Sequence, residues 1–403
     1  MTDPMQSLGH SERQKHAGGD HELARRLAAA GIRELGIHAC AVSPITIWLF
    51  VQLRTEAGRV GTGEATLPGQ ETAVVAQLRR LAAPLAGVPA AVDEIRPAGQ
   101  NPAAGALAAA TAAGAIDQAL WDLQGQAAGR PLAGMLGTAR RDDVAVYANI
   151  NRRTRDRSPD GFVASAKAAL AQGFDAIKVA PFDEVRNRSA AAADQLRSAG
   201  EGLARIAAVR AALAPDMRLM VDCHWRFSPA AAAALIPELA ALGVWWLECP
   251  VPEIEDDIDA VRGLRRLAND RRMVLAGCET MIGVGGFRPW IEAQAYDVVM
   301  PDVKHVGGLV DLLLIDELAG AHGIELAPHN PSGPVAHAVS VHMSTLLEGF
   351  LILEQQFDES PRFAGIVDGA LPTADGRAVP PRGHGLGVRL KPSDVQAWQD
   401  RGA

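Results

Sequence analysis

Short apolar runs alternate with helix-like stretches through the second half of the chain. Three of these runs, at 219–221, 244–247 and 274–278, are each followed at once by an acid: Asp222, Glu248 and Glu279. Between the first two, Ser228-Pro229 opens an alanine-rich stretch as a helix N-cap and first helical residue would. The acids stand 26 (222 to 248) and 31 (248 to 279) residues apart, the length of a strand and a crossover helix. This alternation predicts parallel βα units.

Five further apolar runs complete an eight-strand pattern, at 144–147, 176–179, 298–300, 324–326 and 351–353. Eight such units predict an α/β fold, a (β/α)8 barrel over residues 143–360. Chemistry in this architecture lies at the carboxyl ends of the strands, so the residues that directly follow the runs are the candidates for function.

The first third of the chain has a different pattern. Two-residue alternation at 37–42 and 46–53 predicts an antiparallel meander, and helical spacing dominates from 71 to 136. We therefore expect a separate α+β module over residues 21–142. Residues 1–20 are polar and aperiodic, which predicts a mobile arm. The tail, 361–403, contains a short strand pattern at 387–390, and we expect it to return to the N-terminal module.

Composition narrows the class of protein. The chain has 403 residues, 48% hydrophobic residues and a net charge of −8, and it contains no dense basic run. These values argue against a nucleic-acid partner or an anionic membrane partner. The sequence has no uncharged run of eighteen apolar residues and no apolar signal segment, so we expect a cytoplasmic protein. Four cysteines are too few for a disulfide framework, and Cys223, Cys249 and Cys278, each beside an acid, should face the helix layer.

The three acids point to a metal ion. The ends of neighbouring parallel strands lie close together, so Asp222, Glu248 and Glu279 should converge and repel one another. A hard divalent cation bound through oxygen would resolve that repulsion, and an all-carboxylate ligand set suits magnesium. The competing interpretation is three unrelated solvated acids.

An ordered set of motifs gives a family resemblance from about residue 31 to 395. The motifs are Gly61-Thr62-Gly63-Glu64, Ala119-Leu120-Trp121-Asp122 with Gly125, the three acids, Pro301-Asp302 with Gly307-Gly308, Pro328-His329-Asn330, and Gly385-Leu386-Gly387-Val388. The chain resembles the enolase superfamily, in its mandelate racemase-like branch. That resemblance implies a modified TIM barrel capped by the N-terminal and C-terminal segments, one Mg²⁺ ion, and removal of the proton α to a substrate carboxylate to give an enediolate.

Two histidines are the candidate acid and base. His329 and Asp302 follow neighbouring strands, and a carboxylate beside an imidazole fixes its tautomer and favours its protonated form. The pair matches the His-Asp dyad of the family. Where racemases of the branch carry a second strand-2 lysine, this chain has Ala180, so His224, two residues after Asp222, could supply the other base. Similar Asp-x-His arrangements occur in acid-sugar dehydratases. The alternative is that His224 is an ordinary loop histidine.

Three residues are candidates for substrate contact. Lys178 keeps an inward direction and could contact the substrate or pair with a barrel acid. Glu354 matches the family's carboxylate beside the substrate's acid group, where it could be protonated and donate a hydrogen bond. Arg226 could meet a distal hydroxyl or carboxylate, or form a salt bridge. Residues 42–48 correspond to the loop that closes over the site, although their apolar members also suit strand core.

The sequence thus predicts a magnesium-dependent dehydratase of a sugar acid or related α-hydroxy acid, acting on a small-molecule carboxylate. A racemase or epimerase remains an alternative, because His224 and His329 could serve as bases on both faces. A binding or regulatory homologue without turnover is the alternative from another class. We also expect a homo-oligomer.

Overall fold

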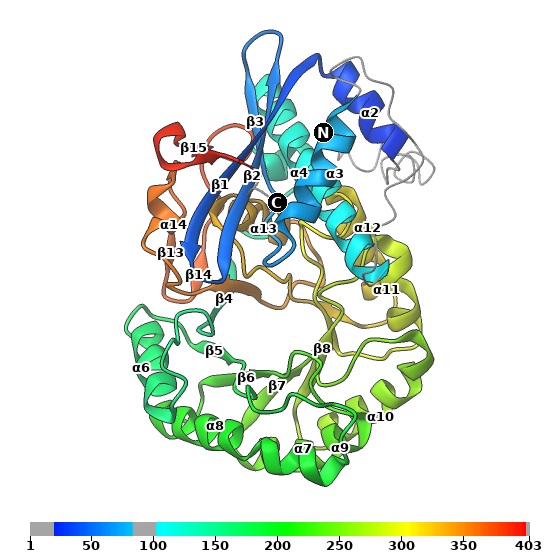
Figure 1. Ribbon diagram of the computed structural model, residues 1–403, viewed down its shortest axis with the longest axis vertical. Coiled ribbons are helices and arrows are strands. Elements are labelled where there is room, and N and C mark those ends of the chain that lie inside the picture. The colour runs from blue at the N-terminus through cyan, green and yellow to red at the C-terminus, as the bar shows by residue number, and fades with distance from the viewer. Residues whose placement is uncertain (1–19, 84–101, 400–403) are drawn as a thin grey trace.

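The computed structural model describes residues 20–83 and 102–399. Eight parallel strands form its centre, in the order of the sequence: β4 (Val144–Asn149), β5 (Ala176–Val179), β6 (Arg218–Asp222), β7 (Val244–Glu248), β8 (Val274–Gly277), β9 (Val298–Val299), β10 (Glu325–Leu326) and β11 (Leu353–Gln356). Strand β11 pairs with β4, and a single bridge between Leu326 and Phe350 links its approach to β10. The sheet therefore closes into the predicted (β/α)8 barrel (Figure 1).

The eighth strand differs from its prediction. Apolar residues 351–353 suggested that the strand ended before Glu354, but the ladder with β4 runs from Leu353 to Gln356, with Glu354 opposite Tyr147. Three polar residues make up the rest of the strand because this end of the barrel faces the site, so hydropathy placed the boundary too early.

Helices form the outer layer of the barrel (Figure 1). They are α6 (Pro159–Leu170), α7 (Ala192–Ser198), α8 (Gly200–Ala212), α9 (Pro229–Ala241), α10 (Ile258–Asn269), α11 (Gly283–Glu292), α12 (Leu309–Gly320) and α13 (Pro334–Ser344). Ser158 caps α6 and Ser228 caps α9, and each side chain accepts a hydrogen bond from a backbone N–H of the first turn. The cap at Ser228 was predicted from the sequence. Inside the barrel, Tyr147, Met220 and Trp246 pack in a fully buried cluster. A second, larger apolar layer separates strands from helices.

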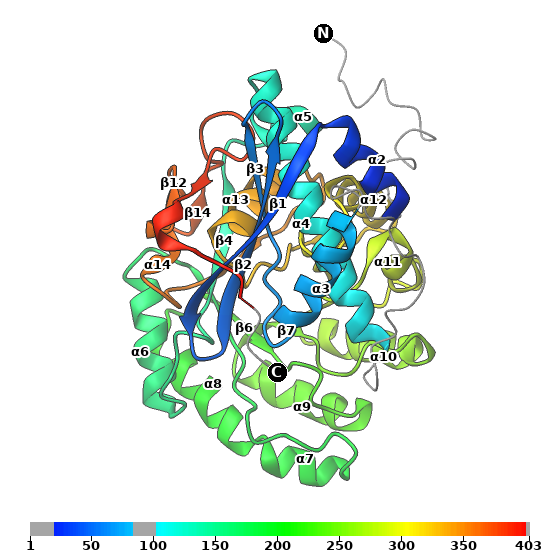
Figure 2. The same cartoon turned by 45° about the horizontal axis from the view of Figure 1, so that its top comes forward.

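Within the described residues, the N-terminal module consists of a four-stranded antiparallel sheet and four helices. Its strands are β1 (Ile32–Ser43), β2 (Thr46–Thr55), β3 (Val60–Glu64) and β16 (Gln396–Ala397), and its helices are α2 (Asp20–Ala29), α3 (Glu71–Ala82), α4 (Pro102–Ala128) and α5 (Leu132–Leu136). The tail returns to this module as expected, because β16 pairs with β1 (Figure 2). We call this module, with the tail, the cap. The predicted mobile arm lies almost entirely outside the described residues.

The tail also contacts the barrel and itself. It contains α14 (Arg362–Gly365), β12 (Val367–Asp368), β13 (Thr373–Ala374), β14 (Arg377–Ala378) and β15 (Arg389–Leu390). Strand β14 pairs antiparallel with β4 of the barrel, and β15 pairs with β12. None of the helices within the described ranges is long and apolar enough to cross a membrane.

The motif Gly61-Thr62-Gly63-Glu64 packs the cap sheet against α4. A Cβ atom on Gly61 would overlap the carbonyl oxygen of Ala119, and one on Gly63 would overlap that of Ala115. Both glycines are therefore required by the close approach of strand β3 to the helix backbone. Asp122 in the same helix accepts hydrogen bonds from Thr62 N and Leu386 N, which joins α4 to the tail, and burial raises the pKa of Asp122 to about 6.

Glu64 joins the cap to the barrel. Its buried carboxylate accepts hydrogen bonds from Gly333 N at 2.7 Å and Ala336 N at 2.8 Å, at the start of α13, and from Thr66 Oγ1 at 2.7 Å. Burial raises the pKa of Glu64 even though these bonds act in the opposite direction. A carboxylate at a helix N-terminus is favourable because the free N–H groups there need acceptors.

Candidate active site

A cavity of about 1010 Å³ lies between the cap and the carboxyl ends of the barrel strands. The turn between β1 and β2 forms part of its wall through Ser43, Pro44, Ile45 and Thr46, as expected for the closing segment 42–48. Trp48 in that segment is instead buried in the core, edge to face with Phe363. The opposite wall carries most of the predicted site residues.

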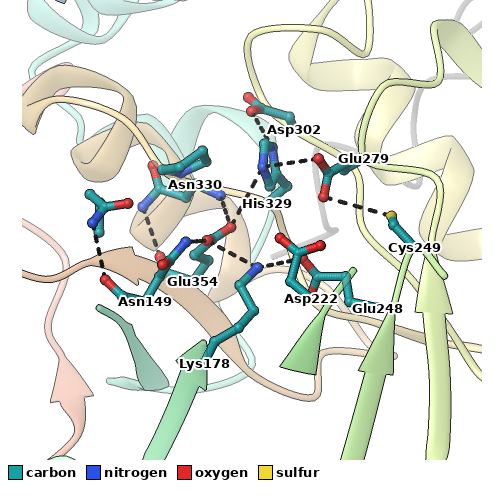
Figure 3. A network of polar contacts seen from close by, with 12 residues as sticks. Asn149, Lys178, Asp222, Glu248, Cys249, Glu279, Asp302, His329, Asn330 and Glu354 are labelled. Atoms are coloured by element: carbon teal, nitrogen blue, oxygen red, sulfur yellow. Dashed lines mark hydrogen bonds and ion pairs between the residues drawn. The ribbon is translucent and has the colours of Figure 1, made fainter. Parts of the chain in front are cut away.

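The three acids converge as predicted. Asp222 and Glu248 stand side by side at the ends of β6 and β7, and Glu279 follows β8 by two residues (Figure 3). All three side chains are buried. Glu248 Oε1 accepts from Lys178 Nζ at 2.5 Å and Glu248 Oε2 accepts from Trp246 Nε1 at 2.8 Å. Such a group of oxygen atoms is the donor chemistry that a hard divalent cation requires.

The pKa values of the three acids are shifted in different directions. Burial raises the pKa of Glu248 to about 8, with Asp222 acting in the same direction and Lys178 against it. Burial also raises the pKa of Glu279 well above its ordinary value, and its carboxylate neighbours add to that effect. For Asp222, burial acts upward but His224 and Lys178 outweigh it and bring the pKa to about 2. With all three acids ionised, the cluster would hold more negative charge than Lys178 compensates, so added positive charge would favour their ionised forms.

In the described parts of the chain, no three His, Cys, Asp or Glu side chains stand in direct metal-binding geometry. The reason is visible in their partners: Glu248 faces Lys178 and Trp246, while Asp222 Oδ2 lies 2.8 Å from His224 Nε2. The residues fit magnesium by the chemistry of their oxygen donors, and the metal assignment stays a prediction.

Left-handed backbone flanks every one of these acids. His224 has φ 47° and Trp225 φ 55° after Asp222, Cys249 has φ 42° after Glu248, and Cys278 has φ 75° before Glu279. Such conformations are unfavourable for residues with a Cβ atom and gather where a site demands them. They also break the alternation of strand faces. Cys223 and Cys278 lie in the layer between strands and helices as expected, but Cys249 Sγ lies 3.9 Å from Glu279 Oε2, which corrects that prediction for Cys249.

His329 and Asp302 form the predicted pair. His329 Nδ1 lies 2.9 Å from Asp302 Oδ2, so Nδ1 carries the proton and Nε2 is left on the cavity side (Figure 3). Nε2 lies 3.7 Å from Glu279 Oε1 and 3.8 Å from Glu354 Oε2. Burial acts to raise the pKa of Asp302, but Lys304, His305 and His329 together hold it well below its usual range.

His224 lines the cavity on the other side of the barrel, since it follows the third strand and His329 follows the seventh. Its side chain is 44% exposed and its Nε2 contacts Asp222. Burial acts to lower the pKa of His224, but the Asp222 carboxylate outweighs burial and raises it. The side chain of His224 points into the cavity as predicted, while its role as a base stays a prediction.

Lys178 is buried and pairs with two barrel acids, the second of the two interpretations given above. Its Nζ lies 2.5 Å from Glu248 Oε1 and 3.1 Å from Glu354 Oε1. Burial acts to lower the pKa of Lys178, but these acids raise it well above its ordinary value. Lys178 also lines the cavity.

Glu354 differs from its predicted protonated state. Its oxygens accept from Asn149 Nδ2 at 2.5 Å and from Asn330 N at 3.0 Å, in addition to the Lys178 contact. Burial alone would raise the pKa of Glu354, but Lys178, His329 and these donors lower it. The ionised carboxylate therefore accepts hydrogen bonds here.

Arg226 does not join the site. Its Nη1 donates to the carbonyl oxygen of Val185 at 3.0 Å, and Arg226 is not among the residues that line the cavity. The left-handed turn at His224 and Trp225 ends the strand direction from which its orientation was predicted.

Lys304 and His305 are among the cavity residues that the sequence analysis missed. They stand two and three residues after Asp302, and their position after a strand end could have identified them. Lys304 Nζ lies 2.5 Å from Asp302 Oδ2, the oxygen that also holds His329.

A barrel capped by both ends of its chain, with acids on three successive strand ends and a His-Asp pair across from them, defines the class of the enolase-type barrels. Family models agree: Mandelate racemase / muconate lactonizing enzyme, N-terminal domain, matches residues 39–137, and Enolase C-terminal domain-like matches residues 161–395. The chain belongs to the enolase superfamily, in its mandelate racemase-like branch.

Curated relatives carry dehydratase names. The chain is 30% identical over 353 residues to D-galactonate dehydratase of Ralstonia nicotianae, covering 85% of this chain and 88% of the relative. It is 31% identical over 302 residues to D-gluconate dehydratase of Thermoproteus tenax, covering 72% of this chain but only 59% of that relative's length. Among solved structures, mandelate racemase/muconate lactonizing enzyme from Jannaschia sp. CCS1 has a TM-score of 0.74 at 23% identity, covering 90% of this chain and 96% of that one. That likeness supports the fold.

Proposed function

We propose that this protein is a magnesium-dependent dehydratase of a sugar acid, which yields a 2-keto-3-deoxy acid. The observation that carries the proposal is the arrangement of one cavity, with three converging acids, His224 on one side and the His329–Asp302 pair across from it. The names of the two dehydratase relatives support this reaction class over the others of the superfamily.

Asp222, Glu248 and Glu279 would hold the magnesium ion. When bound, the ion supplies a Lewis acid that stabilises negative charge developing on the substrate carboxylate. Lys178 stands beside Glu248 and Glu354 and compensates part of the negative charge at this end of the cavity.

The chain's own groups account for both proton movements. His224 takes the proton from the carbon next to the carboxylate, and the electron pair of that C–H bond stays on this carbon and the adjoining carboxylate. That pair then forms a carbon–carbon double bond as the β-hydroxyl leaves. His329, which enters this step with protons on both Nδ1 and Nε2, donates the Nε2 proton to the departing hydroxyl, which leaves as water, and the enol that remains becomes the 2-keto-3-deoxy acid. Asp302 holds the Nδ1 proton of His329 throughout, so that Nε2 is the nitrogen that exchanges protons.

The roles of the histidines are tested by separating proton removal from elimination. We expect His224→Asn to abolish both turnover and exchange of the α-hydrogen with deuterated water. His329→Asn should abolish elimination while leaving exchange. Exchange that survives in His224→Asn and vanishes in His329→Asn would reverse the two roles.

An epimerase is the second candidate, because His224 and His329 stand across the cavity and could exchange protons with both faces of one carbon. The product decides between the two reactions. Dehydration gives a keto acid that reacts with semicarbazide and carries deuterium at C3 when formed in deuterated water. Recovery of only the C2 epimer, with the C3 hydroxyl retained, would refute dehydration.

A further inference from the structure

Lys304 and His305 form a feature of the cavity that the proposed reaction does not use. They follow β9 in the loop before α12 and line the cavity next to the His329–Asp302 pair. The exposed fraction of the Lys304 side chain is 3% and that of His305 is 4%, so both polar groups are held inside the protein. Buried polar groups need partners, and the partners of these two define what they can still bind.

Lys304 has hydrogen-bond donors to spare. An ammonium group carries three N–H donors. Among the described residues, Nζ donates to Asp302 Oδ2 at 2.5 Å, and this is the one hydrogen bond that it makes there. Its own backbone N–H also bonds to Asp302 Oδ1, at 2.8 Å, so Asp302 fixes the lysine at two points. The charge is compensated by the carboxylate while donor capacity remains.

His305 has an acceptor to spare. Thr111 Oγ1, on α4 of the cap, donates its single proton to Leu107 O at 2.7 Å, so Thr111 can only accept from His305 Nδ1, which lies 2.9 Å away. His305 Nδ1 therefore carries the ring proton. Nε2 lies 3.6 Å from Asp302 Oδ2, beyond hydrogen-bond distance, and keeps its lone pair. Burial lowers the pKa of His305 to about 3, which keeps the ring neutral and preserves that acceptor.

The loop that carries both residues is held in place by the cap. Gln118 Nε2 donates to Val303 O at 3.2 Å, and a Cβ atom on Gly114 would lie 2.5 Å from Lys304 O, so α4 packs directly on the loop backbone. A donor and an acceptor are thus fixed on adjacent residues of one wall. A hydroxyl group, which both accepts and donates, is the chemical partner that satisfies such a pair.

We propose that Lys304 and His305 form a binding subsite for one hydroxyl group of the substrate, on the His329 side of the cavity. Lys304 Nζ donates to the hydroxyl oxygen and His305 Nε2 accepts the hydroxyl proton. This inference rests on the proposed function only in taking the ligand to be a polyhydroxy carboxylic acid. It identifies the subsite as one that distinguishes hydroxylated acids from their deoxy analogues.

The test compares affinities for a hexonic acid and for its 3-, 4- and 5-deoxy analogues, measured by calorimetry with magnesium present. A His224→Asn background prevents consumption of the acid. We expect Lys304→Met to weaken binding of the parent acid by roughly 10- to 100-fold, the effect of a lost charge-assisted hydrogen bond. The same change should have little effect on one deoxy analogue, the one that lacks the hydroxyl bound here. His305→Phe should show the same pattern with a smaller loss, about 3- to 10-fold.

Further variants separate binding from folding. Lys304→Gln keeps a donor without the charge and should restore part of the affinity, and His305→Gln keeps an acceptor. Lys167→Met, an exposed lysine on α6, is the matched control and should leave all four affinities unchanged. An equal loss for the parent and every analogue would mean that Lys304 acts only through Asp302, and would overturn the subsite.

Failure of the subsite and failure of the proposed function give different results. Turnover of the parent acid by the unmodified protein, without any selective loss in Lys304→Met, would refute the subsite and keep the dehydratase. If Lys304→Met loses affinity selectively but the unmodified protein turns over no sugar acid, the subsite would be kept and the dehydratase refuted. Absence of binding by all four acids would refute both.

Discussion

Replacing His342 should make the fold less sensitive to acid. His342 is buried in α13, where Nε2 donates to the carbonyl oxygen of Leu386 at 3.3 Å and Nδ1 has no hydrogen-bond partner within the described residues. Burial lowers its pKa to about 4, below that of the unfolded chain, and the bond to Leu386 only partly opposes this. As pH falls below about 6.5, the unfolded chain binds a proton that the folded protein does not, so the free energy of unfolding falls until about pH 4.

The size of this effect follows from the same values. At pH 5 the pH is about 1.5 units below the pKa of a histidine in the unfolded chain, and each unit corresponds to about 1.4 kcal/mol. His342 therefore lowers the free energy of unfolding at pH 5 by about 2 kcal/mol. His342→Gln can keep a donor for Leu386 O and does not titrate. The difference in free energy of unfolding between this variant and the unmodified protein should therefore shift by about 2 kcal/mol in favour of the variant between pH 7.5 and pH 5.

Urea unfolding followed by circular dichroism at the two pH values measures this gain. His384→Gln, in an exposed part of the tail, is the control and should show no such gain. Equal pH dependence in His342→Gln and the unmodified protein would refute the argument that His342 is held neutral by burial.

Three other perturbations have defined outcomes. Glu248→Gln removes one of the proposed metal ligands and should weaken magnesium binding, measured by calorimetry, whereas unchanged affinity and turnover would contradict the ligand assignment. Gly63→Ala should destabilise the protein by more than about 2 kcal/mol in urea unfolding, because the added Cβ meets backbone rather than a movable side chain. Glu359→Ala should raise KM more than it lowers kcat, because it removes the acceptor of the Ser43 Oγ hydrogen bond at 3.0 Å that holds the turn over the cavity; an unchanged KM would count against this role.

Local pattern was sufficient for the barrel and for the residues at its strand ends. Each apolar run overlaps one strand, although β11 extends beyond its run, and Asp222, Glu248 and Asp302 all lie at the carboxyl edge of the barrel, so sequence position alone predicts their neighbourhood. Orientation beyond the strand ends could not be predicted this way. Cys249 is itself left-handed and Arg226 follows two left-handed residues, which resets the direction of their side chains, and periodicity contains no sign of such turns.

Contacts between distant segments were also beyond the reach of periodicity. The partner that fixes the His305 ring, Thr111, is 194 residues away, and the partners of Glu64 in α13 are 269 and 272 residues away. Nothing in the local sequence of Glu64 distinguishes a carboxylate that binds a helix N-terminus from a solvated one. The family motif identified Glu64 as important without indicating why.

The pairing of β16 with β1 has a consequence for the order in which the protein can be completed during synthesis. The cap sheet emerges first from the ribosome, but its edge strand is made last, and Glu64 must wait for the donors of α13 before its burial is favourable. The nascent chain therefore exposes a strand edge and an unsatisfied acid while the barrel is translated. A chain that stops before Gln396 would leave His38 and Ala39 without these strand partners, and we expect it to aggregate more readily than the full chain.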